Sequence, residues 1–189
     1  MNPTLPRTIA NPATGDRIIF IQSPLLGDSD WLVFRCILPP HAAGAPLHSH
    51  NAMTETFLVE SGALEIDLGG GRTRILRAGE TMTIKPGTPH GFRNPLDTET
   101  RFVTTADPGA DLELFLRTIY QLESDRISAA RSLPSIALML ASVMARTDMV
   151  ISGLPRWIQR ACLILAAVIA KALGLEAIAP FTTRAQGAA

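Results

Sequence analysis

The sequence has few cysteines and no excess of either charge, and each shortage excludes a class of protein. Cys36 and Cys162 are the only cysteines among 189 residues, and neither belongs to a CxxC pair. The sequence therefore encodes neither a disulfide framework nor a zinc ribbon. Basic and acidic side chains number 17 each, so the net charge is zero. Nonspecific nucleic-acid binding lacks its electrostatic driving force here, and we expect no nucleic-acid partner.

Signs of a secretory or membrane protein are also missing. Residues 1–16 contain three prolines and no apolar segment, so they do not resemble a secretory signal. The apolar run 161–170 spans ten residues, against the roughly twenty that a bilayer core requires. We therefore expect a cytoplasmic protein with reduced thiols, and at most a weak association with a membrane surface.

Residues 15–107 carry the pattern of a β domain that follows an N-terminal arm, residues 1–14. Short apolar or alternating runs recur between turn-forming residues, and the linking segments are too short for crossover helices. The sequence thus predicts antiparallel pairing and excludes a parallel sheet. The expected strands lie in RIIFIQ, WLVFRCIL, ETFLVESG, ALEIDLG, TRILRAG, TMTIKPG and RFVTTADPG.

Residues 108–177 change to helical spacing and precede a flexible tail, residues 178–189. Apolar side chains from Leu112 to Leu122 recur at helical intervals behind Asp111, which we expect to cap an amphipathic helix on the barrel. Two further helices are predicted, one from Ser135 and one that opens with Pro155 in its first turn and closes at Gly174. Their apolar composition suits a buried hairpin or a dimer interface, and a membrane-surface helix is the alternative. We expect a homodimer.

All four histidines fall between residues 41 and 90, and three of them can converge. His48 and His50 are one residue apart, so an extended segment projects both to the same face, and Glu55 follows shortly after. A tight turn, Pro86 to Pro89, then delivers His90. Three imidazoles and one carboxylate would suit iron, manganese, nickel, copper or zinc.

This order and spacing resemble the cupin superfamily. Its first motif, HxH followed by Glu and then Gly, is matched by His48, His50, Glu55 and Gly62. Its second motif is matched in register by Gly79, Gly87, His90 and Asn94, with Lys85 in place of the usual proline. The resemblance implies a mainly β fold, an antiparallel jelly-roll (double-stranded β-helix) barrel with appended C-terminal α-helices. It also implies that His48, His50, Glu55 and His90 are the metal ligands.

The expected chemistry depends on which divalent transition metal is bound. With iron, which we expect, or with manganese, nickel or copper, the resemblance to cupin dioxygenases of the quercetinase type implies an oxygenase. Its substrate would be a small, largely apolar, hydroxylated or ketonic compound, and Glu55 would be both ligand and catalytic proton acceptor. Zinc would instead support a cyclase, isomerase or lyase. A non-catalytic small-molecule-binding protein is the second alternative.

Four further residues are candidates for the pocket wall: Cys36, Met53, Phe57 and Phe92. The alternation of β-strands puts Phe57 on the same face as Glu55, and Met53 lies beside the metal loop. These side chains are equally compatible with packing in the core. We expect Arg35, on the opposite face from Cys36, to point outward into water, and His41 and Lys85 to be solvent-exposed.

Overall fold

The computed structural model describes residues 5–127, 131–147, 149–151 and 155–175. The predicted C-terminal tail, residues 178–189, lies outside the described residues. The barrel strands are β1 (Thr8–Ala10), β2 (Arg17–Gln22), β3 (Leu32–Leu38), β4 (His48–His50), β5 (Thr54–Ser61), β6 (Ala63–Asp67), β7 (Thr73–Arg77), β8 (Thr81–Ile84), β9 (Gly91–Arg93) and β10 (Thr100–Asp107), with a 3-10 turn η1 (Pro24–Leu26). The tail forms α1 (Ala110–Ile127), α2 (Leu133–Met144), β11 (Met149–Ile151) and α3 (Arg156–Ala172).

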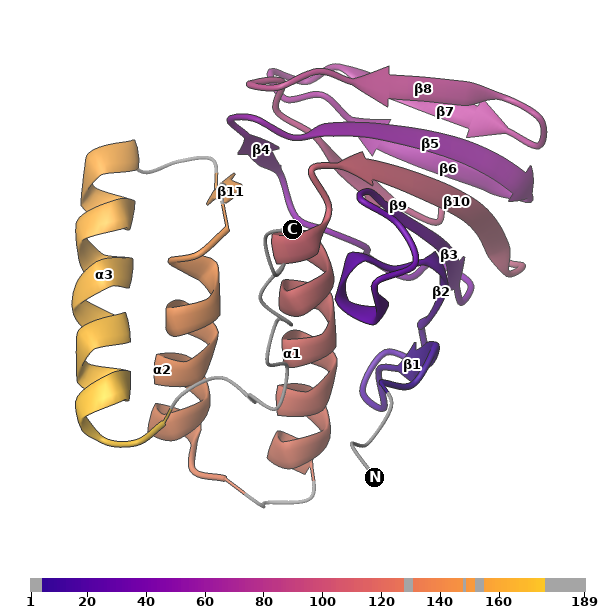
Figure 1. The fold of residues 1–189 in the computed structure, drawn as a ribbon. Helices are drawn as coiled ribbons and strands as arrows, with labels where there is room; N and C mark the ends of the chain where they lie inside the picture. The colour runs from indigo at the N-terminus through magenta and orange to yellow at the C-terminus, as the bar shows by residue number, and fades with distance from the viewer. Residues whose placement is uncertain (1–4, 128–130, 148, 152–154, 176–189) are drawn as a thin grey trace, which may run out of the picture.

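The strands build two facing antiparallel sheets. The larger sheet has the order β1-β2-β3-β10-β5-β8, and the smaller has the order β7-β6-β9. Strand β4 pairs with β11, and an isolated bridge between His48 and His90 joins β4 to the start of β9. All the pairings between described strands are antiparallel. The expected antiparallel jelly roll with appended helices is confirmed (Figure 1).

One hydrophobic core fills the space between the sheets. Alternate residues of β3, β5 and β10 point inward, and Phe57, Val59 and Phe102 are fully buried there. The tight turn from β5 to β6 depends on Gly62, whose φ is +80°. A Cβ atom at this position would also lie 2.5 Å from Oγ1 of Thr100. Only glycine satisfies both constraints, which explains its place in the first motif.

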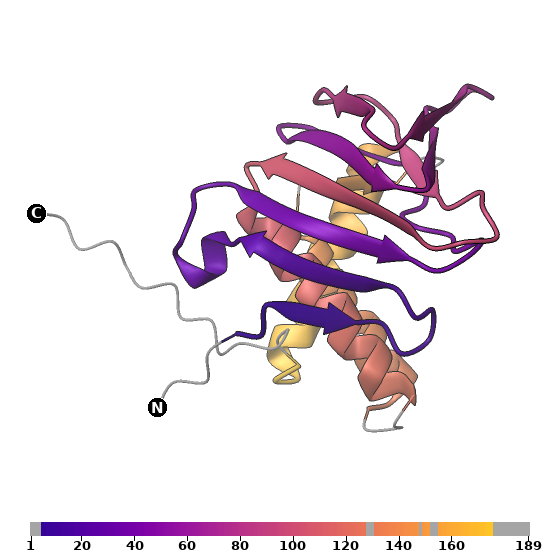
Figure 2. The ribbon, with the colours of Figure 1, turned by 90° about the vertical axis from the view of Figure 1, so that its right-hand side faces the viewer.

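Helix α1 completes the core on the inner face of β2 and β3, as the sequence predicts (Figure 2). Leu112 and Tyr120 join the barrel cluster, and the Tyr120 hydroxyl donates a hydrogen bond to Asp16. Asp111, predicted as the N-cap, lies instead in the first turn, because the helix begins at Ala110. The second helix also begins earlier than expected, at Leu133 instead of Ser135, and Ser132 caps it.

Helix α3 packs on α2 with one side and exposes the other (Figure 1). Pro155 is its N-cap, one residue before the predicted position, and Gly174 follows its end with a φ of +65°. Trp157, Leu165 and other apolar side chains of this helix are largely exposed. The predicted buried hairpin is therefore only half-buried within one chain. No helix in the described part of the chain is long and apolar enough to span a membrane.

Candidate metal centre

Three segments of the barrel aim four side chains at one point. His48 and His50 lie on the inward face of β4, and Glu55 points inward from β5. His90 follows a turn in which Gly87 adopts a φ of +79°. The Gly87 amide donates to the His50 carbonyl at 2.6 Å, which ties this turn to the end of β4. Strand alternation and one turn thus bring together residues 35 positions apart.

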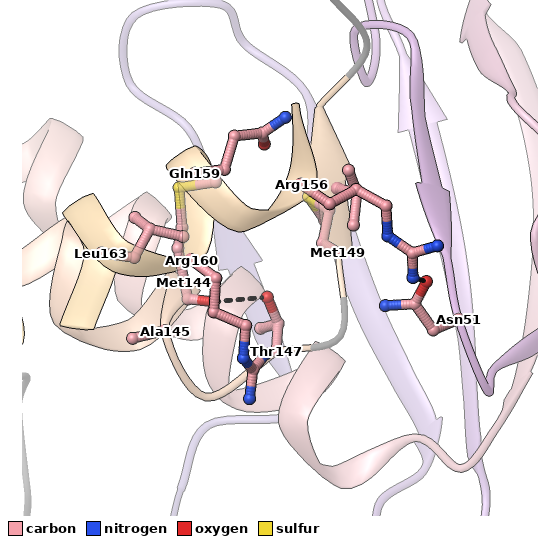
Figure 3. Close-up of a pocket in the computed structure, with 10 residues that line it drawn as sticks. Asn51, Met144, Ala145, Thr147, Met149, Arg156, Gln159, Arg160 and Leu163 are labelled. Carbon is pink, nitrogen blue, oxygen red and sulfur yellow. Dashed lines mark hydrogen bonds between the residues drawn. The ribbon is translucent and has the colours of Figure 1, made fainter. Parts of the chain in front are cut away.

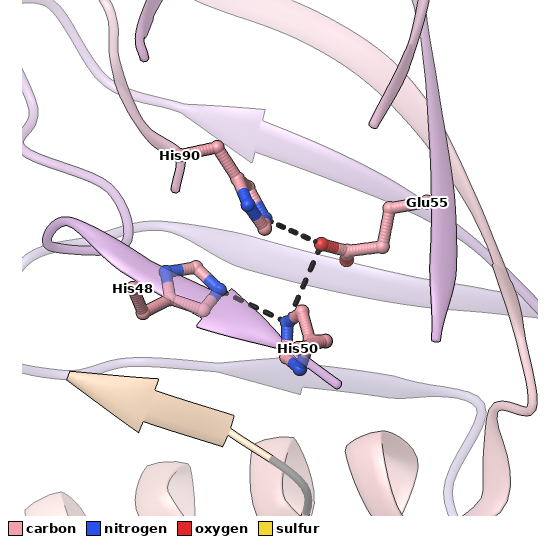
Figure 4. A group of neighbouring side chains, drawn as sticks. All are labelled: His48, His50, Glu55 and His90. Atoms are coloured by element: carbon pink, nitrogen blue, oxygen red, sulfur yellow. Dashed lines mark hydrogen bonds and ion pairs between the residues drawn. The ribbon is translucent and has the colours of Figure 1, made fainter. Parts of the chain in front are cut away.

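The donor atoms of the four side chains form a compact cluster (Figure 4). All of them lie within 4.8 Å of one another, and each residue is 1–6% exposed. His48 Nε2 lies 3.0 Å from His50 Nε2, and His90 Nε2 lies 2.7 Å from Oε2 of Glu55. The His50 Nε2 to Glu55 Oε2 distance is 3.5 Å. The predicted set of His48, His50, Glu55 and His90 is brought together.

Hydrogen bonds on the far side of two rings show why a cation fits this cluster. His48 Nδ1 donates to the Pro46 carbonyl at 2.8 Å, and His90 Nδ1 donates to the Thr88 carbonyl at 3.1 Å. In the neutral rings the lone pairs of Nε2 therefore face the cluster, where they meet other acceptors. A metal ion bound between these lone pairs would remove their mutual repulsion. In metal sites, backbone carbonyls of this kind orient the ligating histidines.

Burial and neighbouring charge hold these groups in the forms that bind metal. Burial, assisted by the nearby His90 ring, lowers the pKa of His48 to about 4. Burial alone would raise the pKa of Glu55, but hydrogen bonds with His50 and His90 outweigh it and lower this pKa to about 2. At neutral pH His48 is therefore neutral and Glu55 is ionised, as ligands must be.

A cavity of about 250 Å³ reaches the metal centre at His50. Its wall combines residues of the barrel, such as Met53, with residues of the tail, such as Leu112, Arg146 and Met149. This volume is below the roughly 300–1,000 Å³ typical of pockets for drug-sized ligands. The cavity therefore suits a small molecule, and the tail forms part of its wall.

The four pocket candidates occupy different places. Met53 lines the cavity beside His50. The Phe57 ring centroid lies 6.3 Å from that of His90 and 5.8 Å from that of Phe92, so both phenylalanines pack behind the metal ligands. Cys36 is buried in the core on β3, where burial raises the pKa of its thiol. Of the four, only Met53 lines this cavity.

The outward positions expected for three other residues are confirmed. Arg35 makes two short hydrogen bonds to Glu60 on the outer face of the barrel. His41 is exposed and lies 2.6 Å from a carboxylate oxygen of Asp97, and Lys85 is exposed. None of the three belongs to the metal cluster.

Strand β11 is the part of the site that sequence reasoning missed. Its three residues pair with His48, Ser49 and His50, so the tail adds a strand beside the metal ligands. The Gln159 side chain of α3 clamps this strand: its Nε2 donates to the Ile151 carbonyl at 2.7 Å, and its Oε1 accepts from the Ile151 amide at 3.1 Å. An apolar triplet between two helices carries no strand signal of its own.

This clamp gives a prediction for amide hydrogen exchange. Replacing Gln159 with Ala removes the acceptor of the Ile151 amide, and a lost hydrogen bond of about 1 kcal/mol corresponds to exchange about fivefold faster at that amide. Hydrogen-exchange mass spectrometry or NMR measures the rate. The control is Gln121→Ala, because Gln121 bonds only within α1, to Asp125. Unchanged exchange of the Ile151 amide in Gln159→Ala would show that the clamp does not hold the strand.

Comparison with known families agrees with this geometry. Residues 34–106, which include all four ligand candidates, match the Cupin domain family. These residues form a cupin domain. The resemblance first suggested by the two sequence motifs is thereby confirmed, and cupins commonly hold a metal at this position. No curated protein compared with the chain matches it.

Several solved structures are similar to the barrel. A protein from Klebsiella pneumoniae with a double-stranded β-helix domain shares 26% identity, with a TM-score of 0.43, and the match covers 57% of this chain and 82% of that one. A sugar phosphate isomerase of the cupin superfamily from Silicibacter pomeroyi shares 21% identity, with a TM-score of 0.46, over 55% and 74% of the two chains. An oxalate oxidase in complex with glycolate shares 25% identity, with a TM-score of 0.42, over 49% and 51%.

Proposed function

We propose that this cupin is a metal-dependent oxygenase that acts on a small hydroxylated or ketonic compound. The observation that carries the proposal is the buried cluster of three histidines and one glutamate, which opens onto a cavity of about 250 Å³. Of the metals that suit this donor set, iron is the one we propose. A bound iron would supply the redox chemistry needed for oxidation by dioxygen.

The protein's own residues hold and shield the reacting centre. His48, His50 and His90 supply neutral nitrogen donors from rings fixed by backbone contacts or burial, and Glu55 supplies the negative charge. The aromatic cluster of Phe57, Phe92 and Phe102 closes the barrel behind His90. Substrate therefore approaches from the opposite side, where His50 and Met53 line the cavity. Glu55 Oε2 lies 3.5 Å from Nε2 of His50, and we propose that this carboxylate accepts a proton released from the substrate.

Oxygen uptake by the iron-loaded protein tests the oxygenase. A panel of enolisable ketones and polyphenols, assayed with an oxygen electrode and by mass spectrometry of products, should contain a substrate that consumes oxygen stoichiometrically. Turnover of the panel without oxygen uptake would overturn the oxygenase and favour a redox-neutral zinc cyclase, isomerase or lyase. Binding without turnover under either metal would favour the non-catalytic alternative.

The variant Glu55→Gln separates the ligand role from the proton-transfer role. We expect it to bind iron more weakly and, even when iron is saturating, to lose at least about a hundredfold in turnover, the scale of general-base catalysis. Iron content and kcat are measured on the same sample. Glu60→Gln is the control, because Glu60 lies on the same strand but pairs with Arg35 outside the barrel. Unimpaired kcat in iron-saturated Glu55→Gln would restrict Glu55 to the role of ligand.

The expected homodimer belongs to the same proposal. The exposed apolar face of α3, which includes Trp157, Leu165 and Val168, is the surface that a second copy would cover. Light scattering measures the mass in solution, and a monomer would contradict the dimer. The cytoplasmic location remains a prediction from the sequence.

A further inference from the structure

A second cavity adjoins the one at His50. It measures about 210 Å³ and lies between α2, β11 and α3 (Figure 3). Thr147 and Met149 line both cavities, so the two are neighbours in one cleft between the barrel and the tail. We call this pair of cavities the tail cleft. It begins at a metal ligand, and most of its wall comes from residues outside the cupin motifs.

Three arginines are among the described residues that line the tail cleft. Arg146 lines the cavity at His50, and Arg156 and Arg160 line the second cavity. Of the described residues that line the two cavities, Asp111 is the only acidic one. The side chains of Thr147, Asn51 and Gln159 add neutral polar groups to the wall.

These three arginines, like Arg72, Arg74 and Arg77 on the barrel, form no ion pair with a described carboxylate, whereas most of the other described arginines do. Arg35, Arg93 and Arg117, for example, each bind a carboxylate of the protein. Among the described residues, no carboxylate forms an ion pair with Arg146, Arg156 or Arg160. All three side chains are exposed to solvent and line the two adjoining cavities, so they are accessible to a dissolved anion. Guanidinium groups bind carboxylate and phosphate with paired hydrogen bonds.

The structure also ties these arginines to the metal centre. The Arg156 guanidinium donates a hydrogen bond to Oδ1 of Asn51, the residue directly after His50 (Figure 3). One turn later in the same helix, Gln159 clamps β11 against the strand of His48 and His50. Helix α3 therefore contacts the residue that follows His50 and the strand that pairs with His48 and His50.

We propose that Arg146, Arg156 and Arg160 bind an anionic group of the substrate, a carboxylate or a phosphate, whose remaining part reaches His50. The proposal rests on the proposed function and narrows its substrate class to small organic anions. It thereby replaces the largely apolar substrate expected from the sequence. That expectation considered the barrel interior, whereas the cavity at His50 is walled in part by a charged tail.

Binding measurements on the full chain test this assignment. The probes are phenylpyruvate, an enolisable ketone with a carboxylate, and phenylacetone, the same ketone without the carboxylate. Isothermal titration with the zinc-loaded protein should show phenylpyruvate binding at least about tenfold more tightly, because a charge-assisted hydrogen bond is worth this much or more. Inorganic phosphate is the third probe, and tighter binding of phosphate than of phenylpyruvate assigns the site to a phosphate group.

Variants locate the binding site. Arg146→Gln and Arg156→Gln should each weaken phenylpyruvate binding about tenfold and leave phenylacetone binding unchanged. The control is Arg126→Gln, which removes the same charge from an exposed pair with Glu123 on α1. Thermal melting of each variant checks that the fold is retained. Equal affinity for the two ketones, or unchanged phenylpyruvate affinity in both cleft variants, overturns the proposal.

Titration of metal-free protein separates this proposal from the proposed function. A carboxylate can bind to a metal directly, so the arginine contribution is isolated when the metal is removed with a chelator. Arginine-dependent binding of phenylpyruvate that persists without metal supports the anion site even if no oxygenase activity is found. The opposite result has two parts: the arginine variants do not affect anion binding in the metal-loaded protein, and the metal-free protein binds no anion. That result would assign the anion to the metal and overturn the arginine site.

Discussion

His50→Ala and His90→Ala proteins should be isolated without stoichiometric metal, and their affinity for added iron or zinc should fall by at least about a hundredfold. Each substitution removes one of four donors that lie within 4.8 Å of one another. Loss of a mere supporting partner of a ligand already costs about 10–100-fold in affinity, so loss of a ligand costs more. Elemental analysis and competition titration with a chromophoric chelator measure the two effects.

The fold should survive these two substitutions. The barrel core is apolar and is built largely from side chains of β3, β5, β6 and β10, so it does not depend on the ion. Circular dichroism checks the secondary structure of the metal-free variants. His41→Ala is the matched control, because His41 is the one histidine outside the cluster and lies exposed beside Asp97. Full metal occupancy in both ligand variants would refute the assigned site.

The second large effect is expected on stability, at a buried ion pair within α1, on the side of the helix that packs against the barrel. Glu113 is fully buried and accepts hydrogen bonds from Ser23 and from Arg117, whose guanidinium lies 3.9 Å from the centroid of the Phe20 ring. Glu113→Gln leaves the positive charge of Arg117 buried without its partner. We expect a loss of about 3–5 kcal/mol in the free energy of unfolding, measured by urea denaturation.

Two further variants test whether the unpaired charge of Arg117 causes the loss of stability in Glu113→Gln. Glu123→Gln breaks an exposed pair with Arg126 and should cost less than about 1 kcal/mol. The double variant Glu113→Leu with Arg117→Met removes both charges, and it should be more stable than Glu113→Gln. A loss below about 1 kcal/mol for Glu113→Gln would show that the buried charge of Arg117 does not depend on Glu113.

The metal cluster was predictable from sequence because its determinants are local. Alternation along β4 puts His48 and His50 on one face, and the turn around Gly87 fixes where His90 begins. The same alternation correctly separated inward Phe57 from outward Arg35. The fixed spacing of the two motifs then predicted that the four ligands meet. Gly62 and Gly87 supply the positive φ angles that the turns in these motifs require.

The tail cleft was not predictable in this way. Pairing between β11 and β4 joins segments about a hundred residues apart, and three residues are too few to show a strand period. The charged wall depends on where α2 and α3 dock, which is decided by tertiary packing of apolar faces rather than by any motif. No motif in the sequence therefore indicates that Arg146 lines the cavity at His50.

The metal content of the natural protein tests the central claim most directly. The full chain is purified without an affinity tag that binds metal and without chelators, and its elements are measured by mass spectrometry. The account predicts about one divalent transition metal per chain, bound by His48, His50, Glu55 and His90. Protein that contains no such metal and takes up neither iron, manganese, nickel, copper nor zinc when each is supplied would contradict it.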